Sequence, residues 1–361
     1  MLTFFAGLPM QSAEAVLRKS VQDFNNWLAS LKKYRANPKG YTGRPKMPGY
    51  LKGERATFTI TNQDAVYYDG YLKLPLTKTR LCLPNIPKGG VLKEVKIKPY
   101  YDNYLILCTF EVKDIVKNNK NKHVASIDFG VNNIAALVTD EGHSFLYKGD
   151  VIKSCNQGFN KKRSELVSIL TKGHTNAKAS SKRLIKLSRK RDSFINDQLH
   201  KISKDIIDNC IKLKIGTIIL GVNKGMKQNS DMGKVNNQNF VNIPISRLMF
   251  MITYKAERVG ITVIEQEESY TSKADFLSKD YIPMYSVDDE LAVFSGTRIK
   301  RGLYKSAKGT FVNADLNAAA NIMRKAGIKA KIGVKVLQNP IMCTFKTQNK
   351  SIPVKGIVAT L

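Results

Sequence analysis

Two aspartates that are far apart in the sequence stand where apolar segments end, and together they could hold metal ions. Asp128 lies in SIDFGVNN, at the end of an apolar run and just before a glycine. Asp315 lies in FVNADLNAAANIM, at the start of an expected helix. A carboxylate in a buried strand is costly to desolvate unless it is paired or binds a metal. Two such groups suit a phosphodiesterase in which two Mg²⁺ ions, about 4 Å apart, activate a water and stabilise the leaving oxygen.

Each aspartate also has a purely structural explanation. Asp128 could cap the turn at Gly130. Asp315 suits the first turn of a helix, where its carboxylate would bind free backbone N–H groups and interact favourably with the helix dipole. Neither residue alone therefore indicates catalysis, and the chemistry depends on a fold that brings them together.

The charge of the chain indicates a polyanionic partner. Its 361 residues carry 59 Lys and Arg against 29 Asp and Glu, which gives a formal net charge of +30. So large an excess repels itself unless a polyanion is present, and nucleic acid is the commonest one. The alternative is a basic protein adapted for solubility or for a membrane surface. The positive residues recur along the whole length rather than in one tail, which favours nucleic acid.

The cysteines and the apolar segments indicate in which cellular compartment the protein is found. The five cysteines are scattered without any C-x-x-C pair, which is typical of reduced, buried residues in the cytoplasm. The segment MLTFFAGLPM lacks the basic start and long apolar core of a signal peptide. No uninterrupted apolar run approaches the roughly 18 residues that a membrane span needs, so we expect no membrane partner.

Hydrophobic periodicity divides the chain into a helix, a run of strands and an α/β region. Residues 11–36 favour an amphipathic helix, which a basic loop rich in Pro and Gly follows at 37–55. The period-two pattern of residues 56–113 predicts short strands that form a small β-barrel. From about residue 122, three strand-like runs precede a helical stretch at 158–213, and the order strand, helix, strand, helix follows. This order is typical of an RNase H-like domain.

Several motifs carry a resemblance to a known family. They are SIDFGVNN, LGVNKGMKQ, YKAERVGI, EESYTSKADF and NADLNAAANI, together with FFAGLPMQSAEAVL and the GRPKMPGY loop. The chain resembles TnpB, the OrfB protein of insertion sequences and a relative of type V CRISPR effectors. The resemblance implies an α/β RNase H-like (RuvC) nuclease domain, preceded by a helical recognition segment and a small wedge-like β-barrel. Relatives usually have residues before the FFAGLP segment, so we expect a minimal recognition lobe or a chain that begins late.

The regions that the resemblance implies follow one another along the chain. They are a recognition lobe with a basic loop (1–55), the wedge-like barrel (56–121), the RuvC-like domain (122–273) with a basic helical insert (158–213), a cysteine-free insert that binds target nucleic acid (274–312), the last RuvC helix (313–330) and a C-terminal tail (331–361).

The family's usual glutamate at the end of the fourth strand of the RuvC sheet is missing. Gly221 stands at that position. Glu267 and Glu268 end the next strand, which runs beside the fourth in an RNase H-like sheet, about 5 Å away. The length of a glutamate and the missing side chain at Gly221 would close much of this gap. Since only one of two consecutive strand residues can face the site, we predict that Glu268 completes it. The alternative is a solvated strand end, which would leave a guided DNA binder without nuclease activity.

The second departure from the family concerns zinc. Many relatives carry two C-x-x-C pairs in the insert, whose four thiolates hold a structural zinc ion. Residues 274–312 contain no cysteine, so we expect no zinc. We expect instead that the insert is held by packing among Phe276, Leu277, Tyr281, Tyr285, Leu291, Phe294 and Tyr304.

The residues expected to contact nucleic acid are basic or aromatic and come from four regions. We expect the N-terminal lobe and the barrel to read a flanking motif and the helical insert to hold a heteroduplex backbone. We expect the loop 223–239 to cover the scissile strand and the TRIKRG segment to bind phosphates. In that order the residues are Arg44, Lys46 and Tyr50; Lys162, Arg163, Lys182, Arg183, Lys186, Arg189 and Lys190; Lys224 and Lys227; and Arg298, Lys300 and Arg301.

The resemblance implies a transposon-encoded, RNA-guided DNA endonuclease whose partners are a guide RNA and a double-stranded target DNA. Asp128, Glu268 and Asp315 would be its catalytic residues and would hold two Mg²⁺ ions, with Mn²⁺ as a substitute. The competing hypothesis is a nuclease-dead, RNA-guided repressor. A DNA transposase is less well supported, because the sequence has no His-hydrophobe-His pair. We expect a prokaryotic cytoplasmic protein that is associated with the nucleoid through DNA.

Overall fold

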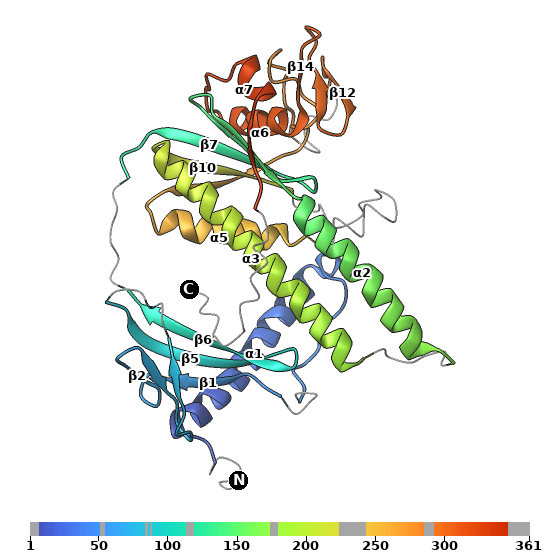
Figure 1. Ribbon diagram of the computed structural model, residues 1–361. Coiled ribbons are helices and arrows are strands. Elements are labelled where there is room, and N and C mark those ends of the chain that lie inside the picture. Colours follow the sequence, from blue (N-terminus) through green and yellow to red (C-terminus); the bar gives the residue numbers. More distant parts are fainter. Residues whose placement is uncertain are drawn as a thin grey trace. The chain divides into compact units, whose positions relative to one another are not determined.

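The chain is organised as two compact units. The computed structural model describes residues 7–50, 55–83, 86, 89–112, 119–173, 180–223, 243–284 and 292–345. One unit comprises Met1–Ile115 with Lys350–Leu361, and the other comprises Val116–Asn349 (Figure 1). None of the helices in the described ranges is both long and apolar enough to span a membrane.

The first unit combines one long helix with two small sheets. Helix α1 (Met10–Ala36) matches the helix expected at 11–36, and its Trp27 indole donates a hydrogen bond to the Pro45 carbonyl in the basic loop at 3.1 Å. The antiparallel sheets have the orders β1-β5-β6 and β2-β3-β4, and their apolar side chains share one core. Closure into a barrel stays a prediction. The elements after α1 are η2 (Pro38–Gly40), β1 (Phe58–Thr61), β2 (Val66–Tyr68), β3 (Tyr71–Lys73), β4 (Arg80–Cys82), β5 (Val91–Tyr100) and β6 (Asn103–Glu111).

The second unit is built on a six-stranded mixed sheet of order β11-β10-β7-β8-β9-β15. Strands β7, β8 and β9 form an antiparallel meander, and β10 and β11 run parallel to β7 on its other side. An α/β fold is therefore confirmed, with the fifth strand beside the fourth as the sequence predicted. The strands are β7 (His123–Phe129), β8 (Asn133–Thr139), β9 (Ser144–Lys148), β10 (Ile215–Val222), β11 (Thr262–Glu267) and β15 (Ile341–Cys343).

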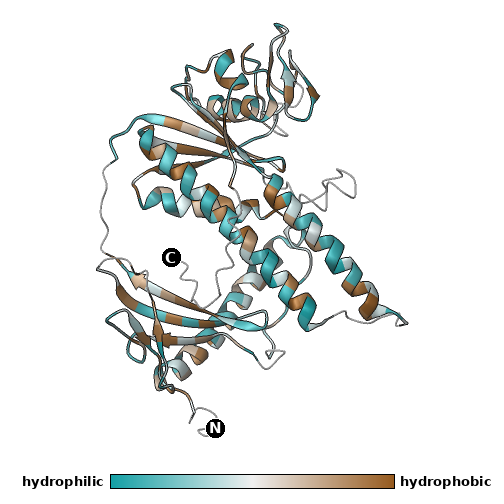
Figure 2. Cartoon of the chain, in the orientation of Figure 1, coloured by the Kyte–Doolittle hydropathy of each residue, from teal (hydrophilic) through white to brown (hydrophobic). Residues whose placement is uncertain are grey.

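Helices cover both faces of this sheet. Helices α3 and α5 pack on one face, and α6 packs on the other, so the two apolar cores receive alternate residues of each strand. Figure 2 shows the resulting apolar strands between helices that have one polar side. The helices of this unit are α2 (Asp150–Thr171), α3 (Lys182–Lys212), α5 (Ile245–Glu257), α6 (Ala314–Lys325) and α7 (Val334–Gln338).

Two expectations about this unit need correction. The helical stretch expected at 158–213 is two helices, and the first of them begins at Asp150, directly after strand β9. The segment expected to be a tail from residue 331 contains α7 and β15. In the described part, residues 331–345, Leu337 is fully buried, and β15 pairs with β9 in parallel, which adds the sixth strand.

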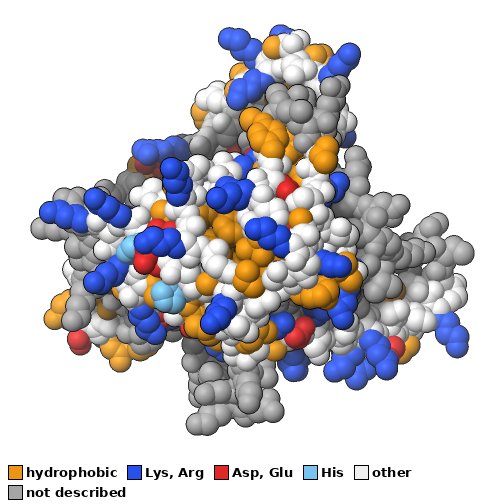
Figure 3. All heavy atoms as spheres, turned by 90° about the horizontal axis from the view of Figure 1, so that it is seen from above, with side chains coloured by type: hydrophobic (Ala, Val, Ile, Leu, Met, Phe, Trp, Pro, Cys, Tyr) orange, Lys and Arg blue, Asp and Glu red, His pale blue; other side chains and the backbone are white. Residues whose placement is uncertain are grey.

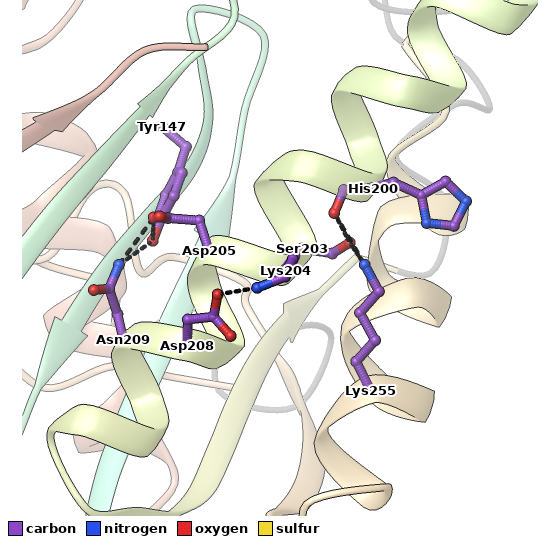
Figure 4. A network of polar contacts seen from close by, with 8 residues as sticks. All are labelled: Tyr147, His200, Ser203, Lys204, Asp205, Asp208, Asn209 and Lys255. Carbon is purple, nitrogen blue, oxygen red and sulfur yellow. Dashed lines mark hydrogen bonds and ion pairs between the residues drawn. The ribbon is translucent and has the colours of Figure 1, made fainter. Parts of the chain in front are cut away.

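A buried polar network fixes helix α3 to the sheet and to α5 (Figure 4). The Tyr147 hydroxyl on β9 donates to Asp205 Oδ2 at 3.0 Å, and Asn209 Nδ2 donates to the same carboxylate oxygen at 2.9 Å. On the other side of α3, Lys255 Nζ donates to the Ser203 hydroxyl at 2.7 Å and to the His200 carbonyl at 2.9 Å. These bonds hold α3 against the sheet and α5, and His200 takes part through its backbone carbonyl.

The insert at 274–312 is held by hydrogen bonds to a buried aspartate as well as by the expected packing of Phe276 and Leu277 against an apolar core. Asp275 accepts bonds from the hydroxyls of Ser278 (2.7 Å) and Ser306 (2.5 Å) and from the backbone N–H groups of Leu277 and Ala307. Tyr304 is fully buried, whereas Tyr281 is 58% exposed, contrary to expectation. Of the other expected packing residues, Phe294 is half-buried, and Tyr285 and Leu291 lie outside the described residues. The strands near this insert are β12 (Thr297–Lys300), β13 (Leu303–Lys305) and β14 (Phe311–Asn313).

Candidate active site

Asp128 lies at the carboxyl end of the central strand of the large sheet. Strand β7 continues only one residue beyond it, and its register places Ile127 beside Leu220 of the parallel strand β10. Gly221 therefore follows at the level of Asp128. Carboxyl ends of parallel strands are the usual place for ligand sites in open α/β sheets.

Glu268 reaches into the space that the missing side chain of Gly221 leaves. Strand β11 pairs Gly221 with Gln266, and the Glu268 backbone N–H donates to the Val222 carbonyl at 3.3 Å. A Cβ atom at Gly221 would lie only 2.7 Å from Glu268 Oε2. The same Cβ would lie 2.5 Å from Ile322 Cδ1, so a larger residue at position 221 would have to displace both this carboxylate and the Ile322 side chain.

The neighbouring Glu267 has a different environment. Its carboxylate accepts bonds from Lys325 Nζ at 2.6 Å and from the backbone and hydroxyl of Ser269. Partial burial acts to raise the pKa of Glu267, but these hydrogen bonds hold it below its ordinary value. Glu267 is thus engaged in a structural ion pair, and of the two glutamates only Glu268 extends toward Gly221.

Asp315 stands in the first turn of helix α6 without serving as its cap. The Asn313 side chain caps this helix by accepting from the N–H groups of Asp315 (3.0 Å) and Leu316 (3.1 Å). The Asp315 carboxylate instead accepts from Asn133 Nδ2 at 2.6 Å, and Ser126 on β7 donates to the Ala319 carbonyl of the same helix. Asn313 therefore fills the capping role, while Asp315 has the first-turn position in which a carboxylate interacts favourably with the helix dipole.

Asn133 and Arg298 have positions at the site that the sequence did not predict. Asn133 is buried at the start of β8, and its Oδ1 atom has no hydrogen-bond partner in the described structure. Arg298, expected only to bind phosphate, forms an ion pair with Asp315 Oδ1 at 3.3 Å. An asparagine directly after the Val131–Asn132 pair is too common a feature to have pointed to this site.

The charges of Glu268 and Asp315 both act on Asp128. Burial raises the pKa of Asp128 well above its ordinary value, and the nearby charges of Glu268 and Asp315 raise it further, while Arg298 acts in the opposite direction. The pKa of Glu268 rises to about 7, through burial and the charge of Glu267. The charged forms of both carboxylates are thus disfavoured relative to water, which an added cation would reverse.

The chemistry of this donor set fits a divalent cation. Three carboxylates and the unpartnered Asn133 oxygen are the hard oxygen ligands that Mg²⁺ prefers. Within the described residues, no three acidic, histidine or cysteine side chains already converge at metal-binding distances. The Asp315 carboxylate instead accepts from Asn133 Nδ2 and forms an ion pair with the Arg298 guanidinium through Oδ1. A metal ion that binds Oδ1 would have to replace this guanidinium.

The predicted nucleic-acid contacts lie in both units and are mostly exposed. Tyr50 is fully exposed in the basic loop, and in Figure 3 Lys and Arg side chains recur over the visible surface while acidic ones are fewer. Lys224 and Lys227 lie outside the described residues. The other exposed residues are Arg44, Lys46, Lys162, Arg163, Lys182, Arg183, Lys186, Lys190, Arg298, Lys300 and Arg301, and Arg189 is half-buried.

Two family descriptions match the chain. Residues 107–227 match OrfB_IS605, described as a probable transposase, and residues 246–322 match the Cas12f1-like TNB domain. TnpB-like protein ORF457 of Acidianus two-tailed virus is 29% identical over 67% of this chain and 49% of its own length. The CRISPR-associated endodeoxyribonuclease Cas12f1 of Sulfoacidibacillus thermotolerans is 31% identical over 39% of this chain and 30% of its own.

Among solved structures, a Cas12f1–sgRNA–target DNA complex is similar to this chain. It has a TM-score of 0.44 and 21% identity, and the match covers 65% of this chain and 46% of the other. The chain spans about half the length of the first curated relative that it matches.

Proposed function

We propose that this chain is an RNA-guided DNA endonuclease of the TnpB family, which its matches to OrfB_IS605 and to the Cas12f1-like TNB domain support. Its substrate would be a DNA duplex that pairs with a guide RNA, and its reaction the hydrolysis of phosphodiester bonds. The name of one relative, a CRISPR-associated endodeoxyribonuclease, supports this activity. The chain would act in the cytoplasm of a prokaryotic cell.

One observation carries the proposal of catalysis: Glu268 Oε2 occupies the space beside Gly221, at the level of Asp128. A relocated acid thus replaces the family's missing glutamate. Asp128 and Glu268 come from neighbouring strand ends, and Asp315 comes from the helix that packs across them. These three carboxylates would hold Mg²⁺.

Mg²⁺, when bound, would supply an activated water and stabilise the charge that develops on the leaving oxygen. The protein's own groups would arrange this site. Asn133 orients the Asp315 carboxylate, and Asn313 fixes the turn of helix from which Asp315 projects. Arg298 compensates the negative charge of Asp315 in the free protein, and it would be available to a phosphate once a cation takes its place.

Cleavage of a plasmid by the chain, purified after co-expression with the RNA encoded beside its gene, tests this function. We expect cutting that requires Mg²⁺ and a matching target, and that disappears in Asp128→Ala. The matched control is Asp197→Ala, which removes an exposed carboxylate on α3 that lies outside both the carboxylate site and the described pocket linings, and should leave cutting unchanged. Target-independent cutting, or cutting that survives Asp128→Ala, would contradict the proposal.

A second candidate function is a guided DNA binder without nuclease activity. It is favoured by the ion pair of Arg298 with Asp315 and by the lack of a preformed metal-binding cluster in the described part of the chain. Binding of the matched target without cutting, at Mg²⁺ or Mn²⁺ concentrations of several millimolar, would support this repressor-like function over the nuclease.

A further inference from the structure

A groove between helices α2 and α3 has no part in the carboxylate site. Its volume is about 630 Å³, within the usual range for small-ligand sites. The residues that line it recur at intervals of three and four, so they occupy one face of each helix. They are Asp150, Val151, Ser154, Cys155, Gly158, Phe159 and Lys162 on α2, and Leu187, Lys190, Arg191 and Phe194 on α3.

Gly158 keeps the middle of this groove open. A Cβ atom there would have no heavy atom within 4 Å, so neither close packing nor a left-handed backbone requires a glycine. Glycine is also among the least favourable residues in a helix interior. The absent side chain leaves room for a ligand at the centre of the lining.

The walls combine aromatic rings with cations. Phe159 and Phe194 are half-buried on opposite helices, and Lys162 and Lys190 are exposed. The Arg191 guanidinium lies 5.2 Å from the centroid of the Phe159 ring and donates to Asn156 Oδ1 at 2.7 Å. These contacts hold the Phe159 ring in place before a ligand binds.

We propose that this groove binds an unpaired nucleotide of RNA, with the base against Phe159 and Phe194 and the phosphate on Lys162 and Lys190. Aromatic side chains with neighbouring cations are the usual means of holding unstacked bases. Asp150 and Ser154 supply oxygen atoms that can bond to a ribose 2′-hydroxyl, which DNA lacks. The proposal deepens the proposed function, because it assigns to these helices a direct contact with single-stranded RNA.

The test compares the full chain with Gly158→Leu, which fills the groove and should not lower the thermal unfolding temperature. Ser164→Leu, an exposed position of α2 outside the groove lining, is the matched control. Fluorescent single-stranded oligouridine is the probe, with oligodeoxyuridine of equal length beside it. We expect Gly158→Leu and Phe159→Ala each to weaken RNA binding about ten-fold, and Ser164→Leu to have no effect.

Alkylation of Cys155, followed by peptide mass spectrometry at pH 8.5, reports occupancy of the groove directly. Oligouridine should slow the reaction of Cys155 in the wild type, and oligodeoxyuridine should slow it less. Three results would each overturn the inference about the groove: equal RNA affinity of the wild type and Gly158→Leu, equal protection of Cys155 by DNA, or no protection of Cys155 by RNA. Guided plasmid cleavage could still occur in each of these cases, so the proposed function would survive them.

Discussion

Asp128 and Asp275 lie in the same unit of the molecule, yet their surroundings act on them in opposite ways. Burial acts to raise the pKa of Asp275, but hydrogen bonds from two serine hydroxyls and two backbone N–H groups hold it below the ordinary value. Burial and the facing carboxylates raise the pKa of Asp128. A carboxylate surrounded by donors stabilises the fold, whereas one that faces other carboxylates is destabilised until a cation arrives.

The largest expected effect follows from removing the site aspartate. Asp128→Ala should lower guided cleavage at least about 1000-fold, because it removes a metal ligand, and should not lower stability, because it relieves repulsion among the carboxylates. Cleavage rates and thermal unfolding of the same preparation check both parts. A variant that unfolds at a much lower temperature would show that Asp128 is structural, like Asp275.

Removal of the structural aspartate should have the reverse outcome. Asp275→Ala would leave four donors without their acceptor, and we expect it to destabilise the second unit by about 3 kcal/mol. Urea unfolding measures this loss. Ser278→Ala removes only one of the four bonds and should cost about 1 kcal/mol. Equal losses of stability for the two variants would show that the four bonds to Asp275 do not act together to hold the insert.

The pH dependence of stability should distinguish the two glutamates. Because the folded pKa of Glu268 is raised to about 7 from 4.5, its favourable contribution is complete below pH 4.5 and is lost as the pH rises through 7. Glu268→Gln should therefore stabilise the Mg²⁺-free protein by up to about 2 kcal/mol at pH 8 and have little effect at pH 4.5.

Glu267→Gln is the control and should have the opposite sign. The folded pKa of Glu267 is lowered, so its contribution is present at pH 8 and is lost as the pH falls through that lowered value. This substitution should destabilise the protein at pH 8. Thermal unfolding at both pH values checks the pair, and identical profiles would contradict the distinction between them.

The smallest effect on stability is expected at Arg298. Its side chain is 44% exposed, so its ion pair with Asp315 should contribute less than about 1 kcal/mol. Arg298→Ala should nevertheless raise the affinity for Mn²⁺ by a few-fold, because Asp315 Oδ1 loses a competing cation. Titration followed by the electron paramagnetic resonance of free Mn²⁺ measures this, and an unchanged or weaker affinity would show that Arg298 does not compete.

Much of the sheet could be predicted from the sequence, because its strands are apolar runs whose order along the chain is typical of one fold. The position of Glu268 could be predicted for two reasons. Gly221 stands where the family usually has a glutamate, and the spacing of neighbouring strands fixes how far apart their ends lie. Asn133, Arg298 and the donors around Asp275 could not be predicted. Their partners lie up to 182 residues away in the chain, and Asn, Arg and Ser have no periodic pattern that reveals a tertiary contact.

The central claim is that the acid has moved from the end of β10 to Glu268, directly after the neighbouring strand β11. Guided plasmid cleavage by Glu268→Gln and Glu267→Gln, measured side by side with the same RNA and Mg²⁺, tests this claim most directly. We predict that Glu268→Gln loses at least about 100-fold in rate, while Glu267→Gln stays within a few-fold of the wild type. Normal cleavage by Glu268→Gln would contradict the account.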